Sequence, residues 1–269
     1  MRGDAHDLRR FYASPLGRAA RGSIAIGLSR VWRPIPNERL VGLGYALPWL
    51  ADPAIDAERT LALMPAAQGA RRWPKDGPSR TAIVYEEELP LSDASVDRIL
   101  LVHALEHSEQ PVETLREAHR VLAANGRLVV VVPHRRGLWA RFEHTPFGTG
   151  RPWSRRQLAA VLEEAGFRVA DVNDALMFPP VPHPVVGRLW RPLDWTGRKA
   201  FSTFSGAILA VGAKGPPVEG VPATRLLRRP VAAPEWAAEG ATGRCCRTAL
   251  PIGRNQASDG SRPFAVTSL

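Results

Sequence analysis

The sequence has little cysteine and no long apolar run. Its two cysteines, Cys245 and Cys246, are adjacent, so they cannot supply a disulfide framework or the spaced ligands of a structural zinc site. No stretch approaches the roughly 20 apolar residues that a membrane-spanning helix needs. The residues after Met1 also lack the apolar segment of a secretory signal. These absences predict a cytoplasmic protein without disulfides and without a membrane partner.

Acidic residues are outnumbered by basic ones. The chain has 36 Lys and Arg against 26 Asp and Glu, which gives a formal net charge of +10. Such an excess attracts polyanions, so nucleic acid is a possible partner. The arginines are scattered along the chain, however, and do not gather on one expected helix. Nucleic acid is therefore not favoured over a small-molecule partner, and the sequence does not predict an oligomeric state.

The chain is long enough for one large domain with appendages. A helix is expected over residues 7–32, ended by Pro34 and Pro36. Short apolar runs alternate with helical patterns thereafter, which predicts a doubly wound, mostly parallel sheet. Strands are expected at 40–45, 59–64, 80–85, 97–102, 128–132, 169–177 and 206–212, with helices opening at Pro48 and spanning 111–124 and 154–165.

Composition divides the chain into parts. Residues 1–36 are expected to form an N-terminal helical extension and residues 37–215 the α/β domain. Within that domain, residues 179–199 are rich in Pro, Trp and Arg and are interpreted as an insertion that forms either a lid or a partner surface. Residues 216–269 have many Pro, Ala, Gly and Arg and no sustained period, so a disordered basic tail is expected.

The order of features from Glu87 to Phe167 carries a family resemblance. Leu89-Pro90 precedes a strand that begins near Asp97, Leu105-Glu106-His107 follows that strand, and a strand of four consecutive valines comes later. This order resembles the class I S-adenosylmethionine-dependent methyltransferases of the type 11 group. The resemblance implies a seven-stranded Rossmann-like sheet with helices on both faces and an antiparallel last strand. It also implies a methyltransferase that acts on an unidentified small molecule.

The segment that matches the cofactor turn of this family departs from its pattern. Gly44 falls on the first glycine of the motif, Ala46 replaces the second, and Gly42 stands where an acid is usual. No carboxylate follows Met64, where the family has a partner for the ribose. The resemblance implies that Gly42, Gly44 and Ala46 contact S-adenosylmethionine, with weak or lost affinity. A binding or regulatory protein that keeps the fold without catalysis is therefore the alternative.

Three further residues are candidates for the site. Glu86 and Leu89 follow the third expected strand, near the position of the adenine in the family. His103 ends the fourth strand and is expected to face the cleft, as a cofactor contact and as a general base, because imidazole titrates near neutral pH. A hydrogen-bonded histidine without a chemical role is the competing interpretation.

His103, Glu106 and His107 also fit the spacing of an inverted zincin metallopeptidase, in which two histidines bind zinc and the glutamate activates water. That motif lies within a helix, whereas here a β-type run leads directly into His103. The zinc metallopeptidase is therefore the least favoured function, and no metal site is predicted.

Overall fold

The computed structural model describes residues 3–32, 36–51, 57–181, 189–192, 194 and 205–215. Most of the expected insertion at 179–199 and the whole of the expected basic tail, 216–269, lie outside the described residues.

Seven strands form one mixed sheet in the order β3-β2-β1-β4-β5-β7-β6. Strands β1 to β5 are parallel to one another, and β7 runs antiparallel to both β5 and β6. The predicted doubly wound sheet with an antiparallel last strand is confirmed. The strands are β1 (Arg39–Gly44), β2 (Arg59–Pro65), β3 (Thr81–Val84), β4 (Val96–Val102), β5 (Leu122–Pro133), β6 (Phe167–Ala175) and β7 (Ala207–Lys214).

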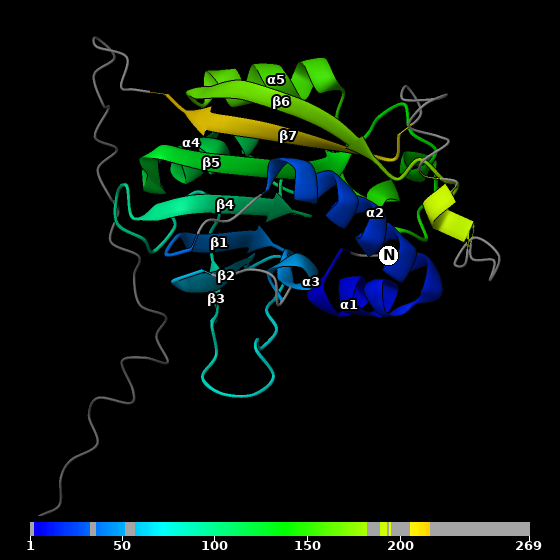
Figure 1. Ribbon diagram of the computed structural model, residues 1–269, viewed down its shortest axis with the longest axis horizontal. Helices are drawn as coiled ribbons and strands as arrows, with labels where there is room; N and C mark the ends of the chain where they lie inside the picture. The colour runs from blue at the N-terminus through cyan, green and yellow to red at the C-terminus, as the bar shows by residue number, and fades with distance from the viewer. Residues whose placement is uncertain are drawn as a thin grey trace, which may run out of the picture. The chain divides into compact units, whose positions relative to one another are not determined.

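Helices cover both faces of the sheet (Figure 1). One apolar cluster joins the first three helices to one face, and a second joins the last two to the other. The helices are α1 (Ala5–Ala13), α2 (Pro15–Val31), α3 (Leu47–Leu50), α4 (Pro111–Val121) and α5 (Arg155–Glu164), with 3-10 turns η1 (Trp139–Arg141) and η2 (Pro146–Gly148).

The valines of β5 show why its sequence is apolar without alternation. Val129 and Val131 belong to the cluster under α2, whereas Val130 and Val132 belong to the cluster under α4 and α5. Successive side chains of a strand point to opposite faces, and here both faces are covered. A continuous apolar run is therefore the pattern of a central strand.

The single helix expected over residues 7–32 is two helices, so that expectation is wrong. Ser14 adopts an extended conformation and its side chain accepts a hydrogen bond from Gly17 N (3.0 Å), which caps α2. Pro15 disfavours a helical conformation at the residue before it and suits the first helical position. The chain bends sharply there: a Cβ on Gly17 would lie 1.9 Å from Phe11 O. Ser14-Pro15 was the sequence signal for this break.

The boundary between α4 and β5 also differs from the expectation. The helix ends at Val121 instead of residue 124, and β5 begins at Leu122, which pairs with Val96. The register then shifts, because Arg98 pairs with Arg127. Residues 125–126, which lie between the expected helix and the expected strand, are therefore an irregular stretch within β5 and not a connection before it.

Bends in the chain place α1 at the carboxyl ends of the parallel strands. In Figure 1, α1 and α3 lie beyond the arrowheads of β1 and β2, and α2 runs from there across the sheet. Among the described residues, no helix is both long and apolar enough to cross a membrane.

An ion pair joins the opposite, amino ends of β1 and β4. Asp97 accepts hydrogen bonds from Arg39 N (2.9 Å), Nε (2.9 Å) and Nη2 (3.1 Å). The hydrogen bonds from Arg39 hold the pKa of the Asp97 carboxyl below its usual value. Asp97 thus has a structural position remote from the carboxyl edge of the sheet.

We expect Asp97→Asn to lower the free energy of unfolding by about 1 kcal/mol, a modest value because both side chains are partly exposed. Since the folded-state pKa is depressed, this stabilisation is present at neutral pH and is lost as the pH falls below about 4, through the folded pKa. Urea titrations of both proteins between neutral and acidic pH measure the effect, with the exposed Asp76→Asn as the control. Equal stability of wild type and variant at pH 7 would contradict this role.

Candidate active site

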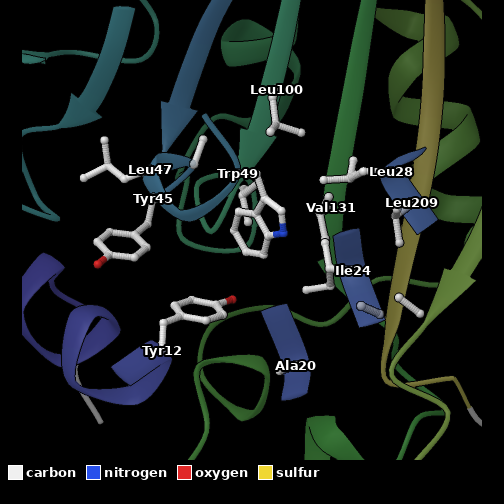
Figure 2. Close-up of a cluster of buried hydrophobic side chains, with 14 of the residues drawn as sticks. Tyr12, Ala20, Ile24, Leu28, Tyr45, Leu47, Trp49, Leu100, Val131 and Leu209 are labelled. Carbon is white, nitrogen blue, oxygen red and sulfur yellow. The ribbon is translucent and has the colours of Figure 1, made fainter. Parts of the chain in front are cut away.

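The carboxyl ends of β1 and β4 adjoin at one edge of the sheet. Gly44 pairs with Val102, and the N–H of Tyr45 donates to Val102 O (2.8 Å). Ligands of open α/β sheets bind outside the carboxyl ends of the strands, so a ligand site is expected at this edge. Figure 2 shows Tyr12 of α1 facing Tyr45 and Trp49 at these strand ends.

The turn from β1 to α3 requires glycine at position 44. Gly44 has a φ of +81°, and a Cβ there would lie 2.3 Å from Val102 O and 2.8 Å from Ala104 Cβ. A side chain is excluded both by the backbone conformation and by the approach of β4. Ala46 follows as the fully buried residue that precedes α3. The expected cofactor turn therefore has the tight strand-to-helix geometry that the resemblance implies.

At Gly42 the space for an acidic side chain is already filled. A Cβ at this position would lie 2.4 Å from Leu50 Cδ1 and 2.7 Å from Ala46 Cβ. Apolar side chains from α3 and its preceding turn thus occupy the place of the missing acid. The packing around Gly42 therefore leaves no room for the acidic side chain of the family pattern.

Gln68, which the sequence analysis missed, lies just beyond the end of β2. Its Nε2 donates to His103 O (2.7 Å), and its buried Oε1 has no hydrogen-bond partner among the described residues. A buried acceptor without a partner is uncommon in folded proteins and calls for an explanation. The only sequence signal was a long polar side chain three residues after the strand end.

Glu86 and Leu89 follow β3 but have different surroundings. Glu86 is half-buried, and burial raises the pKa of its carboxyl, with the charges of Glu87 and Glu109 acting in the same direction. Leu89 is buried and its N–H donates to Glu117 Oε1 (2.7 Å) on α4. The Leu89 backbone N–H is therefore engaged in anchoring its loop, while the Glu86 side chain remains a candidate contact.

His103 is the centre of a buried hydrogen-bonded chain. Its Nδ1 lies 2.9 Å from Glu106 Oε1, and its Nε2 lies 2.7 Å from the hydroxyl of Tyr12. An ionised Glu106 can only accept, so Nδ1 carries the proton and Nε2 accepts from Tyr12. His103 also has a φ of +52°, a conformation that non-glycine residues adopt at a cost and often at functional sites.

Aromatic rings surround the Tyr12 hydroxyl. The Tyr12 ring stacks on Tyr45 (5.9 Å between centroids, 8° between planes) and meets Trp49 edge-on at 5.3 Å. Phe147 lies 4.9 Å from the His103 ring. Burial, and then the charge of Glu106, raise the pKa of Tyr12 well above its usual value. Tyr12 is thus a protonated donor to His103 at neutral pH.

Glu106, like Gln68, has a buried acceptor atom beside His103. Glu106 Oε2 has no hydrogen-bond partner among the described residues, as is also true of Gln68 Oε1. Both residues contact His103 through their other polar atom. The surroundings of His103 therefore offer two unpaired acceptors, which suit the hydroxyl or ammonium groups of a bound molecule.

The arrangement does not have the geometry of the metallopeptidase alternative. Residues 103–107 form bends and turns instead of a helix, and both ring nitrogens of His103 are engaged by Tyr12 and Glu106. The His107 side chain lies beside Gly3 and Gly150. Within the described ranges, no group of three or more metal-ligating side chains is gathered.

Comparisons with known proteins agree with this architecture. Residues 41–130 match the family model described as "Methyltransferase domain". A chain from the Haloferax volcanii complex of the Trm112 methyltransferase activator and a methyltransferase is 20% identical, with 78% of this chain and 95% of that chain covered and a TM-score of 0.56. No match was found among the curated proteins.

Two further solved structures have a similar fold. A Thermotoga maritima S-adenosylmethionine-dependent methyltransferase is 18% identical, with 78% of this chain and 95% of that chain covered and a TM-score of 0.52. Geranyl diphosphate C-methyltransferase from Streptomyces coelicolor, solved with S-adenosyl-L-homocysteine, is 15% identical, with 72% and 76% covered and a TM-score of 0.50. At these identities the structural likeness concerns the fold.

Strand order, the antiparallel β7 and the family match together define a class I methyltransferase fold. The family match covers residues 41–130 of this fold, from within β1 into β5. This confirms the resemblance that the sequence carries between Glu87 and Phe167.

We expect Gly42→Asp to destabilise the domain and not to restore the family motif. The new side chain would displace Leu50 and bury a carboxylate, at a cost of about 1–3 kcal/mol from overpacking alone. Denaturant titration measures the loss. Gly215→Asp, at a glycine with no atom within 4 Å of an added Cβ, is the matched control. Unchanged stability together with tighter binding of S-adenosylhomocysteine would contradict this expectation. It would show that the Leu50 side chain moves aside and that position 42 can accommodate an acid.

Proposed function

We propose that this chain is an S-adenosylmethionine-dependent methyltransferase that acts on a small molecule at the carboxyl ends of β1, β2 and β4. The observation that carries the proposal is the pair of buried, unpaired acceptors, Gln68 Oε1 and Glu106 Oε2, on either side of His103. They lie at the edge of the sheet where open α/β folds bind ligands, and a bound ligand would supply the missing hydrogen bonds.

The residues at this edge can hold S-adenosylmethionine, with fewer charged contacts than the family pattern provides. Gly44 allows close approach at the β1 turn, with Ala46 beside it. Gln68 takes the role of the absent carboxylate, because Oε1 can accept a hydrogen bond from a ribose hydroxyl. Glu86 is the candidate contact on the adenine side. Bound S-adenosylmethionine supplies an electrophilic methyl group on a positively charged sulfonium.

The substitutions in the motif predict weak affinity. Leu50 and Ala46 fill the acid position at Gly42, and a neutral amide replaces the second acid. Hydrogen bonds to charged groups contribute about 1.5–3 kcal/mol each. Because each 1.4 kcal/mol is a factor of about ten in affinity, the loss of two acids weakens binding by roughly two orders of magnitude or more.

His103 is the base in this proposal. Glu106 fixes the tautomer that keeps the lone pair on Nε2, where a proton can be taken, and it stabilises the imidazolium that results. The remaining contribution of the site is to hold the acceptor in line with the methyl group and to exclude water. The aromatic side chains of Tyr45, Trp49 and Phe147 serve that purpose, because all three are buried around His103 and Tyr12.

The alternative function is that of a binding or regulatory protein without catalysis. It is favoured by the filled acid position at Gly42 and by the Tyr12 side chain, which covers His103 Nε2. The two functions differ in one measurement, since only the enzyme forms S-adenosylhomocysteine as a product.

Calorimetric titration with S-adenosylhomocysteine tests the cofactor site. We expect wild type to bind weakly and Gln68→Leu to bind at least tenfold more weakly, because the substitution removes a hydrogen bond worth about 1.4 kcal/mol or more. The exposed Gln110→Leu is the control. No binding to wild type at millimolar ligand would refute the enzyme, and equal affinity of Gln68→Leu would remove Gln68 from the site.

A further inference from the structure

We infer that the acceptor of this methyltransferase is a phenol, bound where the ring of Tyr12 now lies, and that the reaction is O-methylation. The inference rests on the proposed function and names the substrate class of the same site. Tyr12 presents a phenol to the His103–Glu106 pair from a separate helix, and its hydroxyl lies 2.7 Å from Nε2. The side chain thus stands in for a substrate hydroxyl.

The pocket around the Tyr12 ring is built by other parts of the chain. Tyr45 and Trp49 come from the β1 turn and α3, His103 from the end of β4, and Phe147 from η2. Tyr45 directly follows Gly44, so the ring pocket adjoins the cofactor turn. These walls do not belong to α1, so a phenol can take the place of the Tyr12 ring only when α1 withdraws.

The helix that carries Tyr12 is attached to the strand ends mainly through side chains. Ser14 separates α1 from α2. Among the described residues, the backbone hydrogen bond that ties α1 to the strand ends runs from Ala5 N to Gln68 O (2.9 Å). The remaining attachment consists of side-chain contacts, chiefly of Leu8, Phe11 and Tyr12. Withdrawal of α1 uncovers His103 Nε2 and, at the same time, the backbone of Gln68.

The chemistry of the pocket favours a phenol over other acceptors. Parallel stacking on Tyr45 and edge contact with Trp49 suit a flat aromatic ring. The polar end of the pocket is a neutral imidazole nitrogen that accepts one hydrogen bond, as a phenol hydroxyl requires. A carboxylate in this place would lie close to buried Glu106 without a donor to pair with.

Proton removal is needed because burial disfavours the phenolate, as it does for Tyr12 itself. The phenol oxygen forms a bond to the methyl carbon while the carbon–sulfur bond of the cofactor breaks and its electron pair stays on sulfur. The phenol proton passes to His103 Nε2 and from there to water. The products are an aryl methyl ether and S-adenosylhomocysteine, so atoms and charge balance.

The first experiment uses the full chain with S-adenosylmethionine and 4-methylphenol, the side-chain analogue of tyrosine. Mass spectrometry follows 4-methylanisole, with 4-methylaniline and 4-methylbenzoate as competing acceptors. We expect the phenol to be methylated at least tenfold faster than either competitor, and Tyr12→Ala to raise kcat/KM for it by removing the internal competitor. Exposed Tyr85→Ala is the matched control and leaves the rate unchanged. Preferential methylation of the amine or the carboxylate would overturn the phenol assignment while leaving the methyltransferase in place.

The second experiment needs no cofactor. Calorimetry measures 4-methylphenol and toluene binding to Tyr12→Ala and to Tyr12→Ala/His103→Phe. We expect the phenol to bind at least tenfold more tightly than toluene in the first variant and equally in the second. Equal binding of both ligands to Tyr12→Ala would overturn the acceptor site. Phenol binding through His103 in a chain that binds no S-adenosylhomocysteine would support the phenol site and refute the proposed function. If Tyr12→Ala does not unfold cooperatively, the same comparison is made with Tyr12→Val.

Discussion

The close approach of β1 and β4 at their carboxyl ends is the constraint on which the rest of the site depends. Gly44 turns with φ of +81° directly against Val102 O, where no side chain fits. The turn sends the chain into α3, which places Trp49 and Leu50 under the edge of the sheet. The same contact holds Tyr45 against Val102, the residue before His103, and the rings of Tyr45 and His103 both contact Tyr12.

Polar atoms at this edge are held within an apolar environment, and that contrast defines the site. Tyr12, His103 and Glu106 are buried among aromatic rings yet hydrogen-bonded to one another. Within the part of the chain that the structure describes, Gln68 Oε1 and Glu106 Oε2 have no hydrogen-bond partner, which costs about 1–3 kcal/mol each in a buried setting. Stability alone would favour apolar replacements, and the retained polar atoms are therefore the ones that support the proposed site. At Gly42, by contrast, no polar atom is retained, because the side chains of Leu50 and Ala46 occupy the position of the family's acid.

Much of the fold was predictable because its signals are local. The apolar runs of β1, β4 and β5 are buried on both faces, and Ser154 caps α5 with a reciprocal bond to Gln157, as the sequence pattern predicts. The antiparallel direction of β7 came only from the family resemblance, since periodicity is the same for both directions. The break at Ser14-Pro15 had a local signal that an apparent apolar stripe through both helices concealed.

The sequence by itself determined the strands, the family resemblance and the glycine at position 44, because these depend on short-range pattern and backbone conformation. Only the tertiary structure decided that Tyr12 meets His103 across 91 residues and that Gln68 supports the His103 carbonyl. Such contacts depend on the direction in which α1 leaves the bend at Ser14 and on how loops close over the strand ends. Neither is encoded in periodicity, because an apolar stripe shows that a helix packs and does not show which strand ends it covers.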